Sequence, residues 1–401
     1  MVSDRQIIYI SASLRAVAIG ISGVILALYL TTMDLNATSI GLVLSLGLLG
    51  CAIGTLLATV FTDRLGRRKT LILLNALMTL GGVGLAVMTD QAAIIASVFL
   101  GMVNGMGRDR GAGLTVEQTI IPQTTTASER TTVFAWYNVF VDAGHAIGAL
   151  LGGLPALLRS EWGLSALSSY QWTWGLYSGL SFMAGLFVLR LSTSVEPSHP
   201  VSTTPLSSTS RKTIMRFAGL SGLDSLGGGF LTTALIAYWF FERFGVDESL
   251  LGPLFFFSRV ANGISHLGAA WLANRIGLVN TMVFTHLPSN LLLMAVAFAP
   301  NLYVAITLFL LRELLVEMDV PTRQSYIVAI IRPEERARAT GITNLTRGMA
   351  WAAGPMIAGP IMQISAFAPL LIGPGIKILY DLLLYRAFSQ IKPPEEQGQM
   401  P

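Results

Sequence analysis

Ionisable side chains lie inside several long apolar stretches of the sequence, and they are its first candidates for chemistry. A charge at the centre of a bilayer costs roughly 2.5–3.5 kcal/mol on insertion scales, so a charge that is kept there is expected to have a role or a partner. Acids in such places can take up protons or cations, and guanidinium groups can bind anions. The candidates are Arg15, Arg108, Arg110, Glu117, Asp224, Arg312, Glu313, Glu317, Asp319 and Arg323.

Five of these candidates lie on one expected helix, at residues 302–330, and four of them allow two interpretations. Asp319 and Arg323 are four residues apart, where opposite charges readily pair and neutralise each other. Glu313 and Glu317 share a neighbouring stripe of the same helix and are better candidates for binding a proton or cation.

Arg108 and Arg110 flank Asp109 on the expected helix at 92–119, about two turns before Glu117. Guanidinium groups stay charged and bind carboxylate or phosphate through two hydrogen bonds. They could therefore bind an anionic solute, or they could balance acids on other helices. The candidate charges nearly cancel, which favours balance and leaves the sign of the solute open.

Other kinds of site have no support in the sequence. The four histidines are scattered, no metal-ligand spacing occurs, and no glycine-rich phosphate loop or ATP-binding module is recognisable. The single cysteine, Cys51, allows no intramolecular disulfide and is expected to be a small buried residue. We therefore expect no enzymatic activity, no cofactor and no metal.

The composition is that of a membrane protein with many spans. Hydrophobic residues make up 53% of the chain and charged residues 12%, about half of the charged fraction of an ordinary soluble domain. The net charge of +4 comes from basic residues in short loops between apolar stretches, which argues against binding to nucleic acid. The first apolar stretch, at 7–30, is too long for a signal peptide and is expected to remain as a span.

Twelve helical spans fit the sequence, which predicts an all-α membrane fold. They are expected at 7–30, 38–62, 70–89, 92–119, 131–155, 170–190, 214–241, 249–273, 279–299, 302–330, 337–362 and 367–388.

The basic residues indicate the orientation of these spans. With the N-terminus inside, nearly all loop arginines and lysines fall on the cytoplasmic side, and only Arg159 and Arg243 fall outside. Because Lys and Arg are held on the cytoplasmic side during insertion, both termini are expected there.

A polar segment rich in Ser, Thr and Pro, at 192–213, separates six spans from six and is expected to be a flexible cytoplasmic linker. The predicted organisation is a six-helix bundle at 1–191, this linker, a second six-helix bundle at 214–390, and a cytoplasmic tail at 391–401.

An internal repeat supports two equivalent halves. Asp-Arg-Leu-Gly at 63–66 recurs as Asn-Arg-Ile-Gly at 274–277, an offset of 211 residues. Glu-Arg at 129–130 recurs at 335–336, an offset of 206, with Asn and Gly at matching positions downstream. Both matches fall at equivalent junctions between spans.

The basic run at 63–69, Asp-Arg-Leu-Gly-Arg-Arg-Lys, resembles the loop between helices 2 and 3 of the major facilitator superfamily. Thr59 stands where that family usually has glycine. The resemblance implies two pseudo-symmetric six-helix bundles with a solute site between them. It also implies that helices 1, 4, 7 and 10, which carry the ionisable candidates, line a polar cavity.

The same resemblance implies a charged latch at the cytoplasmic end, which closes when the cavity faces outward. Its expected members are Asp63, Arg64, Gly66 and Arg67, with Arg67 pairing with Glu117 or Glu129.

The glycines of the fifth span resemble the motif of the drug/proton antiporter branch. Gly144, Gly148 and Gly152 occupy its glycine positions, and Ala149 stands in its proline position. The alternative is simple close packing, since small residues at four-residue spacing let membrane helices approach one another. Gly354 is the counterpart of Gly148 in the second half.

Helices 5 and 8 are neighbours in the family's fold, and each carries a polar stripe. These stripes predict a polar seam in which Asp142 pairs with Arg259, either for structure or in one conformation alone. The seam residues are Asn138, Asp142 and His145 on one helix and Arg259, Asn262 and His266 on the other.

The sequence thus predicts a monomeric secondary transporter in a lipid bilayer that exports a small polar or amphipathic molecule in exchange for protons or another coupling ion. The alternative is a symporter or uniporter for an organic anion, and a receptor or sensor without transport is a weaker third interpretation. The expected location is a bacterial or archaeal inner membrane.

Overall fold

The computed structural model describes residues 3–126, 129–196, 207–320, 322–323, 326 and 335–390. These residues form α-helices, two short 3₁₀ helices and connecting turns, with no strand among them, which confirms the predicted all-α fold. The predicted tail at 391–401 and the middle of the predicted linker lie outside the described residues.

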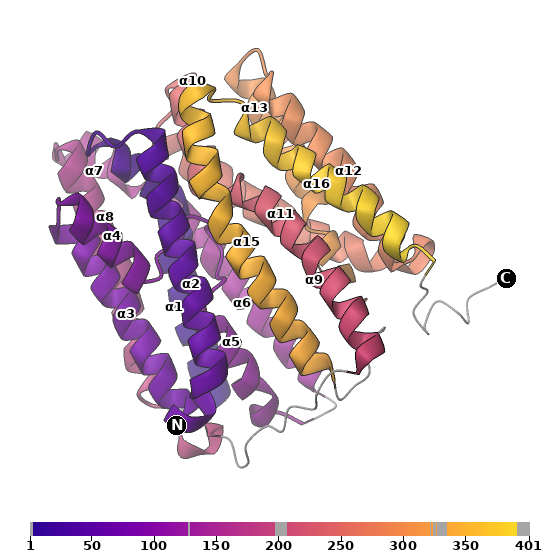
Figure 1. The fold of residues 1–401 in the computed structure, drawn as a ribbon. Helices are drawn as coiled ribbons and strands as arrows, with labels where there is room; N and C mark the ends of the chain where they lie inside the picture. The colour runs from indigo at the N-terminus through magenta and orange to yellow at the C-terminus, as the bar shows by residue number, and fades with distance from the viewer. Residues whose placement is uncertain are drawn as a thin grey trace. The chain divides into compact units, whose positions relative to one another are not determined.

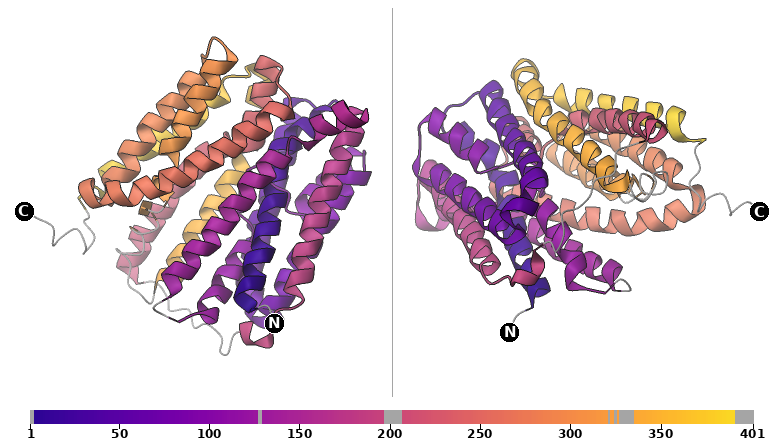
Figure 2. Two further views of the ribbon diagram at one scale, coloured as in Figure 1. Left: turned by 180° about the vertical axis from the view of Figure 1, so that it is seen from behind. Right: turned by 60° about the horizontal axis from the view of Figure 1, so that its bottom comes forward.

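The described helices follow one another along the chain in the order shown in Figures 1 and 2. The first part of the chain contains α1 (Asp4–Thr31), α2 (Ala37–Leu65), α3 (Arg67–Val87), α4 (Gln91–Leu100), α5 (Ala112–Ile120), η1 (Ile121–Thr124), α6 (Arg130–Leu151), α7 (Leu154–Trp162), α8 (Ala166–Val188) and η2 (Thr193–Val195). The second part contains α9 (Ser208–Gly229), α10 (Thr233–Phe244), α11 (Glu248–Ile276), α12 (Leu278–Ala297), α13 (Leu302–Val316), α15 (Arg336–Ile364) and α16 (Pro369–Phe388).

Local sequence signals explain several of these boundaries. The side chains of Ser3, Asn36, Asp90, Ser165 and Asn301 each accept a backbone N–H in the first turn of the helix that follows, which satisfies a donor that the helix itself leaves free. Short polar residues therefore mark the helix starts between apolar stretches.

The chain divides into two compact units. Unit 1 comprises Met1–Pro200, Thr232–Phe256 and Pro355–Gln363, and unit 2 comprises Val201–Leu231, Phe257–Gly354 and Ile364–Pro401. Unit 1 therefore includes α10, the start of α11 and the end of α15 together with the first part of the chain. The predicted boundaries of the two sequence halves remain a prediction.

Each unit is built on helices that pack closely. In unit 1, α1 packs against α6 and α8, and α3 packs against α8. In unit 2, α12 packs against α13 and α16, and α16 also packs against α9. A buried apolar cluster fills each unit, around Tyr137 in the first and around Tyr326 in the second.

Six helical stretches in the described residues are long and apolar enough to cross a bilayer. Large apolar side chains such as those of Leu80 and Leu291 are exposed on the outside of these helices, as expected where a protein faces lipid. The six stretches are Asp4–Thr31, Ala37–Leu65, Arg67–Val87, Thr132–Trp162, Ser210–Phe244 and Leu278–Ala297.

The predicted linker differs from the structure at both of its ends. Asp4 accepts hydrogen bonds from the backbone N–H of Ser192 (2.9 Å) and from the hydroxyls of Ser192 and Ser194, so the chain after α8 is bound to the start of α1. At the other end α9 begins at Ser208, six residues earlier than expected. In the described ends of the predicted linker, serines therefore occupy capping and turn positions.

Candidate functional site

A buried cluster of charges in unit 1, the Arg15 cluster, joins α1 to the fourth predicted span. The guanidinium of Arg15 donates to both oxygens of Glu117 (2.6 and 2.5 Å) and to Oδ2 of Asp109 (2.8 Å). The hydroxyl of Tyr137 donates to Glu117 at 2.7 Å. Two predicted candidates, Arg15 and Glu117, are thus direct partners, and Glu117 has no exposed surface.

The cluster depends on a break in the fourth span, where the sequence predicted one continuous helix at 92–119. The chain leaves helical geometry between α4 and α5, with φ of 51° at Met102 and 62° at Gly107. Glycine tolerates such angles because it lacks a Cβ. The expectation of a continuous helix was wrong because glycines and charged residues interrupt the apolar pattern at this depth.

The free backbone groups of the broken stretch find partners within unit 1. The N–H of Asp109 donates to Nε2 of His145 (2.9 Å), and the N–H of Gly111 donates to Oδ1 of Asp109 (2.9 Å). The N–H of Ala234 on α10 donates to the carbonyl of Gly105 (2.9 Å). Irregular backbone is tolerated inside a membrane protein where it is satisfied in this way. Arg108 and Arg110 lie half-buried in the same stretch.

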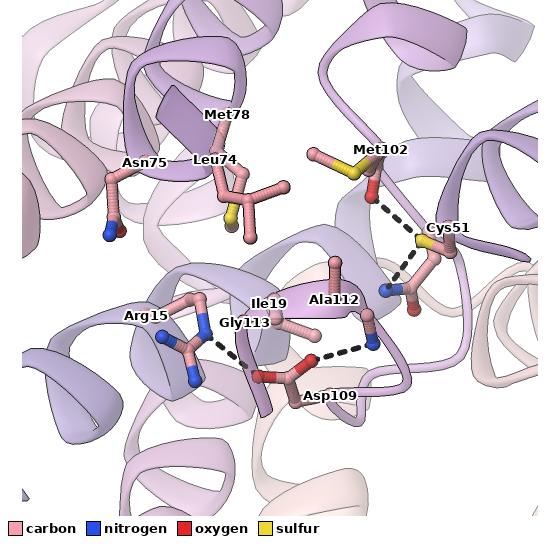
Figure 3. A pocket seen from close by; sticks show the side chains of 12 residues that line it. Arg15, Ile19, Cys51, Leu74, Asn75, Met78, Met102, Asp109, Ala112 and Gly113 are labelled. Carbon is pink, nitrogen blue, oxygen red and sulfur yellow. Dashed lines mark hydrogen bonds and ion pairs between the residues drawn. The ribbon is translucent and has the colours of Figure 1, made fainter. Parts of the chain in front are cut away.

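A small internal cavity of about 20 Å³ lies beside the Arg15 cluster (Figure 3). Arg15 and Asp109 line it together with Asn75, Cys51 and apolar side chains of α1, α3 and the broken stretch. The Oδ1 atom of Asn75 is buried and has no hydrogen-bond partner among the described residues. One water needs roughly 10–15 Å³, so the cavity has room for about one water.

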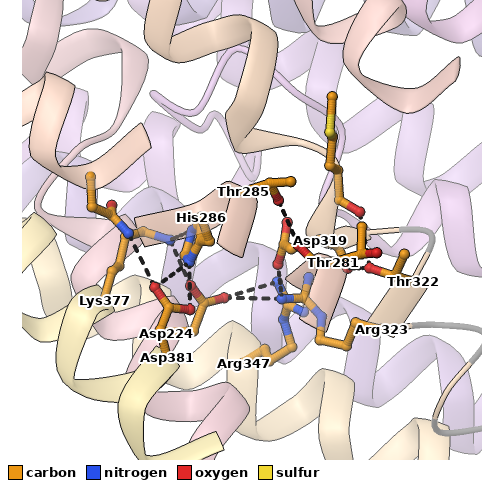
Figure 4. A network of polar contacts seen from close by, with 12 residues as sticks. Asp224, Thr281, Thr285, His286, Asp319, Thr322, Arg323, Arg347, Lys377 and Asp381 are labelled. Atoms are coloured by element: carbon orange, nitrogen blue, oxygen red, sulfur yellow. Dashed lines mark hydrogen bonds and ion pairs between the residues drawn. The ribbon is translucent and has the colours of Figure 1, made fainter. Parts of the chain in front are cut away.

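A second group of buried charges, the Asp224 cluster, lies in unit 2 (Figure 4). The carboxylate of Asp224 on α9 lies 2.6 Å from Nζ of Lys377, 3.3 Å from Arg323 and 3.8 Å from Arg347. Arg323 also pairs with Asp319 at 2.5 Å. The helices α9, α15 and α16 and the chain after α13 all contribute to this cluster.

His286 of α12 extends the Asp224 cluster. Its Nδ1 lies 2.9 and 3.0 Å from the two carboxylate oxygens of Asp381, and its Nε2 lies 3.5 Å from Nζ of Lys377. A charged Lys377 can only donate, so Nε2 of His286 accepts this hydrogen bond. Its Nδ1 then carries the ring proton and donates a hydrogen bond to Asp381. This geometry fits a neutral imidazole that donates through Nδ1 and accepts through Nε2.

The expected helix at 302–330 shows the one pairing that was predicted for it, and it gives Glu313 a separate set of contacts. The pairing of Asp319 with Arg323 is confirmed, and Arg323 also reaches Asp224. Glu313 is buried, pairs with Arg312 and accepts a hydrogen bond from Nδ2 of Asn262 at 2.6 Å. Glu317 is half-buried after the end of α13.

Four members of the Asp224 cluster were missed in the sequence: His286, Arg347, Lys377 and Asp381. Each is an ionisable residue inside an apolar stretch, which is the signal that identified the other candidates. They were passed over because the resemblance pointed to helices 1, 4, 7 and 10 as the cavity helices. An ionisable residue within an apolar stretch was therefore a better predictor of cluster membership than its position on helices 1, 4, 7 or 10.

The predicted polar seam is distributed over both units, so its central pair stays a prediction. In unit 1, Asn138 and Asp142 are exposed, and Oδ1 of Asp142 lies 4.0 Å from Nδ1 of the buried His145. In unit 2, Arg259 donates to Asn262 at 3.5 Å. The remaining member, His266, is half-buried.

The predicted latch residues lie at the junction of α2 and α3. Asp63 and Arg64 are exposed, and Gly66 has φ of 94°. The backbone N–H groups of Arg67 and Arg68 donate to the carboxylate of Glu196 (2.6 and 3.2 Å), which caps α3 from the chain after α8.

The side chain of Arg67 differs from its prediction. Its guanidinium donates to the carbonyl of Val195 at 3.1 Å, and Glu117 is bound by Arg15 instead. Pairing of Arg67 with Glu117 or Glu129 is therefore wrong for this structure. The physical reason is the break in the fourth span, which keeps Glu117 on α5 facing α1. Latching of the outward-facing state remains a prediction.

The glycines of α6 are contact points between helices. A Cβ added to any of them would collide with α1. On Gly144 it would lie 2.8 Å from the carbonyl oxygen of Ser13, and on Gly148 it would lie 2.9 Å from Cα of Gly20. On Gly152 it would lie 2.6 Å from Cβ of Val24. In unit 2, Gly354 packs on Gly229 in the same manner. Close packing accounts for these residues.

Residues 8–355 match the family model described as the Major Facilitator Superfamily. The chain belongs to this superfamily. It is therefore an integral membrane transporter rather than an enzyme. The uncharacterized membrane protein YJR124C of Saccharomyces cerevisiae is 24% identical over 390 residues, which cover 89% of this chain and 87% of that protein.

Solved structures of the superfamily share the fold. The nucleoside transporter NupG is 17% identical, with a TM-score of 0.75 over 97% of this chain and 100% of that one. The D-xylose-proton symporter is 14% identical, with a TM-score of 0.74 over 99% of each chain. The human organic anion transporter MFSD10 (TETRAN) is 17% identical, with a TM-score of 0.65 over 95% of this chain and 98% of that one. At these identities the likeness concerns the fold alone.

Proposed function

We propose that this superfamily member is a proton-coupled secondary transporter that moves a small polar or amphipathic solute by alternating access. The observation that carries the proposal is His286, which is buried between Asp381 and Lys377 in the Asp224 cluster. Histidine is the side chain whose ordinary titration range includes physiological pH.

Protonation of His286 would rearrange its neighbours. The imidazolium keeps its hydrogen bond to Asp381, but its Nε2 then carries a proton and can no longer accept from Lys377. Two positive charges 3.5 Å apart repel, so Lys377 moves further onto Asp224. One proton thus changes the contacts between α12, α16 and α9, which couples proton binding to the positions of helices.

Export by proton antiport is the finer form of the proposal. The glycines of α6 resemble the antiporter motif in their spacing, although close packing alone accounts for them. The second candidate is symport or uniport of an organic anion. Three positive side chains around Asp224 favour that alternative. The proposal places a monomer in a bacterial or archaeal inner membrane with both termini in the cytoplasm.

The direction of coupling can be measured in proteoliposomes that contain a pH-sensitive dye. Vesicles are loaded in turn with a nucleoside, a pentose or an organic anion, which are the solute classes of the structural neighbours. Outward movement of the solute acidifies the lumen in antiport, makes it alkaline in symport, and leaves its pH unchanged in uniport.

Substitution of His286 tests the proton site itself. His286→Gln should keep exchange of labelled for unlabelled solute at equal pH but lose the acceleration of transport by a pH gradient between about pH 5.5 and 7.5. His199→Gln, in the predicted linker, is the matched control. Full pH dependence in His286→Gln would remove His286 from the coupling mechanism.

A further inference from the structure

Three positive side chains in unit 2 converge on the single carboxylate of Asp224, which makes Asp224 resemble the occupant of an anion site. Lys377 and the two guanidinium groups of Arg323 and Arg347 lie between 2.6 and 3.8 Å from its oxygens. The side chains involved are buried to about nine-tenths or more. Charges of one sign are seldom gathered in a membrane helix bundle without a counter-ion.

The two guanidinium groups are held in place by other contacts. Arg323 pairs with Asp319 at 2.5 Å, and Arg347 lies over the ring of Trp351 at 4.7 Å from its centroid. Both can therefore stay where they are if the carboxylate of Asp224 moves away or becomes neutral. A planar guanidinium fixed in this way offers paired donors to the oxygens of an anion.

The cluster lies inside the apolar stretches of its helices. Asp224 is 14 residues into the span Ser210–Phe244, which is about 21 Å at 1.5 Å per residue. Lys377 lies eight residues after the start of α16. An anion that reaches these residues would be a solute in transit rather than the phosphate of a lipid.

We propose that Arg323, Arg347 and Lys377 form a binding site for a solute that carries a phosphate- or sulfate-type dianion, and that Asp224 occupies this site when the solute is absent. This rests on the proposed function only in identifying the bound anion as the transported solute. The dianion replaces one carboxylate with a group of higher charge and more acceptor oxygens, which three cationic donors can satisfy. Asp224 keeps the cations from being buried without a counter-ion in the empty state.

If Asp224 competes with the anion for the three cations, removing its charge should strengthen anion binding. Removing a carboxylate with a purely structural role would not. In Asp224→Asn the internal competitor loses its charge, so sulfate should bind about tenfold more tightly or better. In Arg347→Gln and Lys377→Gln the site loses a donor, so sulfate should bind at least about tenfold more weakly, because each lost charged contact contributes of the order of one factor of ten or more.

The experiment measures the thermal unfolding midpoint of the full-length purified protein at pH 7 in sulfate, glycerol 3-phosphate or glycerol, with ionic strength matched by chloride. Sulfate and glycerol 3-phosphate should raise the midpoint in a saturable manner, because a ligand that binds the folded state stabilises it. Glycerol should not. Arg243→Gln, which removes an exposed arginine of α10, is the matched control and should behave as the wild type.

Three results would each overturn the site. The first is a rise of the unfolding midpoint in glycerol equal to that in glycerol 3-phosphate. The others are unchanged sulfate binding in both Arg347→Gln and Lys377→Gln, and weaker sulfate binding in Asp224→Asn. If Lys377→Gln fails to fold, Arg347→Gln and Asp224→Asn decide the matter. Sulfate binding without solute-driven pH changes would keep the site and reject proton coupling. If neutral solutes drive pH changes in the proteoliposomes and sulfate does not bind, proton coupling is kept and the anion site is rejected.

Discussion

Glu117 accepts three hydrogen bonds in a place closed to solvent, two from Arg15 and one from Tyr137. A buried carboxylate is tolerable only when its charge and lone pairs are satisfied, and here the guanidinium of Arg15 does most of this. The same guanidinium donates to Asp109, so one arginine fixes both α5 and the broken stretch before it to α1.

Glu117→Gln should destabilise the protein far more than Tyr137→Phe. The first substitution removes the charge that faces a buried arginine, which costs about 3–5 kcal/mol in comparable buried pairs. The second leaves that pair intact and removes one hydrogen bond, which costs about 1–3 kcal/mol. Denaturant unfolding in detergent measures both. Equal losses in the two variants would contradict the dominant role of the ion pair.

The sequence could identify the members of these clusters but not their pairing. Arg15 and Glu117 were singled out because they are charges within apolar stretches, and both lie in the Arg15 cluster. Their contact joins positions 102 residues apart, which helical periodicity cannot relate. Asp319 and Arg323, four residues apart, were the pair that local spacing could predict.

The broken segment between α4 and α5 is the element on which unit 1 is centred. Backbone atoms there, rather than side chains alone, meet α1, α6 and α10: Gly107 packs against Gly23, His145 accepts from Asp109, and Ala234 donates to Gly105. A Cβ on Gly23 would lie 2.7 Å from the backbone nitrogen of Gly107, closer than real Cβ contacts allow. The absence of a side chain at Gly23 therefore lets α1 approach the break.

Gly23→Ala should reduce both stability and transport, because backbone cannot move away as a flexible side chain can. We expect a loss of about 1–3 kcal/mol, as for other overpacked interiors. Gly179→Ala in α8 is the matched control, since its new methyl group would meet nothing within 4 Å. Alanine favours a helix over glycine by about 1 kcal/mol, so this control should be neutral or slightly stabilised. Similar thermal unfolding midpoints for the two variants would show that the close approach is unimportant.

Apolar windows could place the helices but could not reveal the break. The stretch at 92–119 is apolar enough to be taken for one span, and its length is right for a bilayer. Glycines at 101, 105, 107, 111 and 113 were the available signal. That signal is ambiguous without coordinates, because closely spaced glycines also serve helix packing, as they do in α6.

Unit 1 as a whole contains contacts between the two halves of the sequence. The hydroxyl of Thr233 donates to the carbonyl of Met106 (2.8 Å), and the hydroxyl of Thr38 donates to Gln363 (2.5 Å). Arg159 of α7 pairs with Glu248 at the start of α11 (2.6 Å). Alternating access requires contacts of this kind to form and break in each cycle. The sequence predicted a seam between α6 and α11 and did not identify the pair of Arg159 and Glu248.

The pair of Arg159 and Glu248 is the strongest electrostatic candidate for such a contact. The side chain of Glu248 is 3% exposed and that of Arg159 26%, so solvent screens the pair only in part. Asp247 lies 3.9 Å from the same guanidinium but is 50% exposed, which makes it a control of equal charge and weaker coupling. A double-mutant cycle with Arg159→Gln and Glu248→Gln should give a coupling energy of about 1–3 kcal/mol in unfolding, against less than about 1 kcal/mol for Arg159→Gln with Asp247→Asn.

Transport rates show whether the pair of Arg159 and Glu248 breaks during the cycle or stays formed throughout it. If the pair breaks once per cycle, Glu248→Gln should change the maximal transport rate by about threefold or more, because a difference of about 0.7 kcal/mol between conformations already has that effect. Arg159→Gln should change it in the same direction, and the double variant should add nothing further, since either substitution removes the whole pair. Asp247→Asn should leave the rate as it is. Additive effects of the two substitutions on the rate, or a rate that stays constant while stability falls, would show that Arg159 and Glu248 serve the fold and not the cycle.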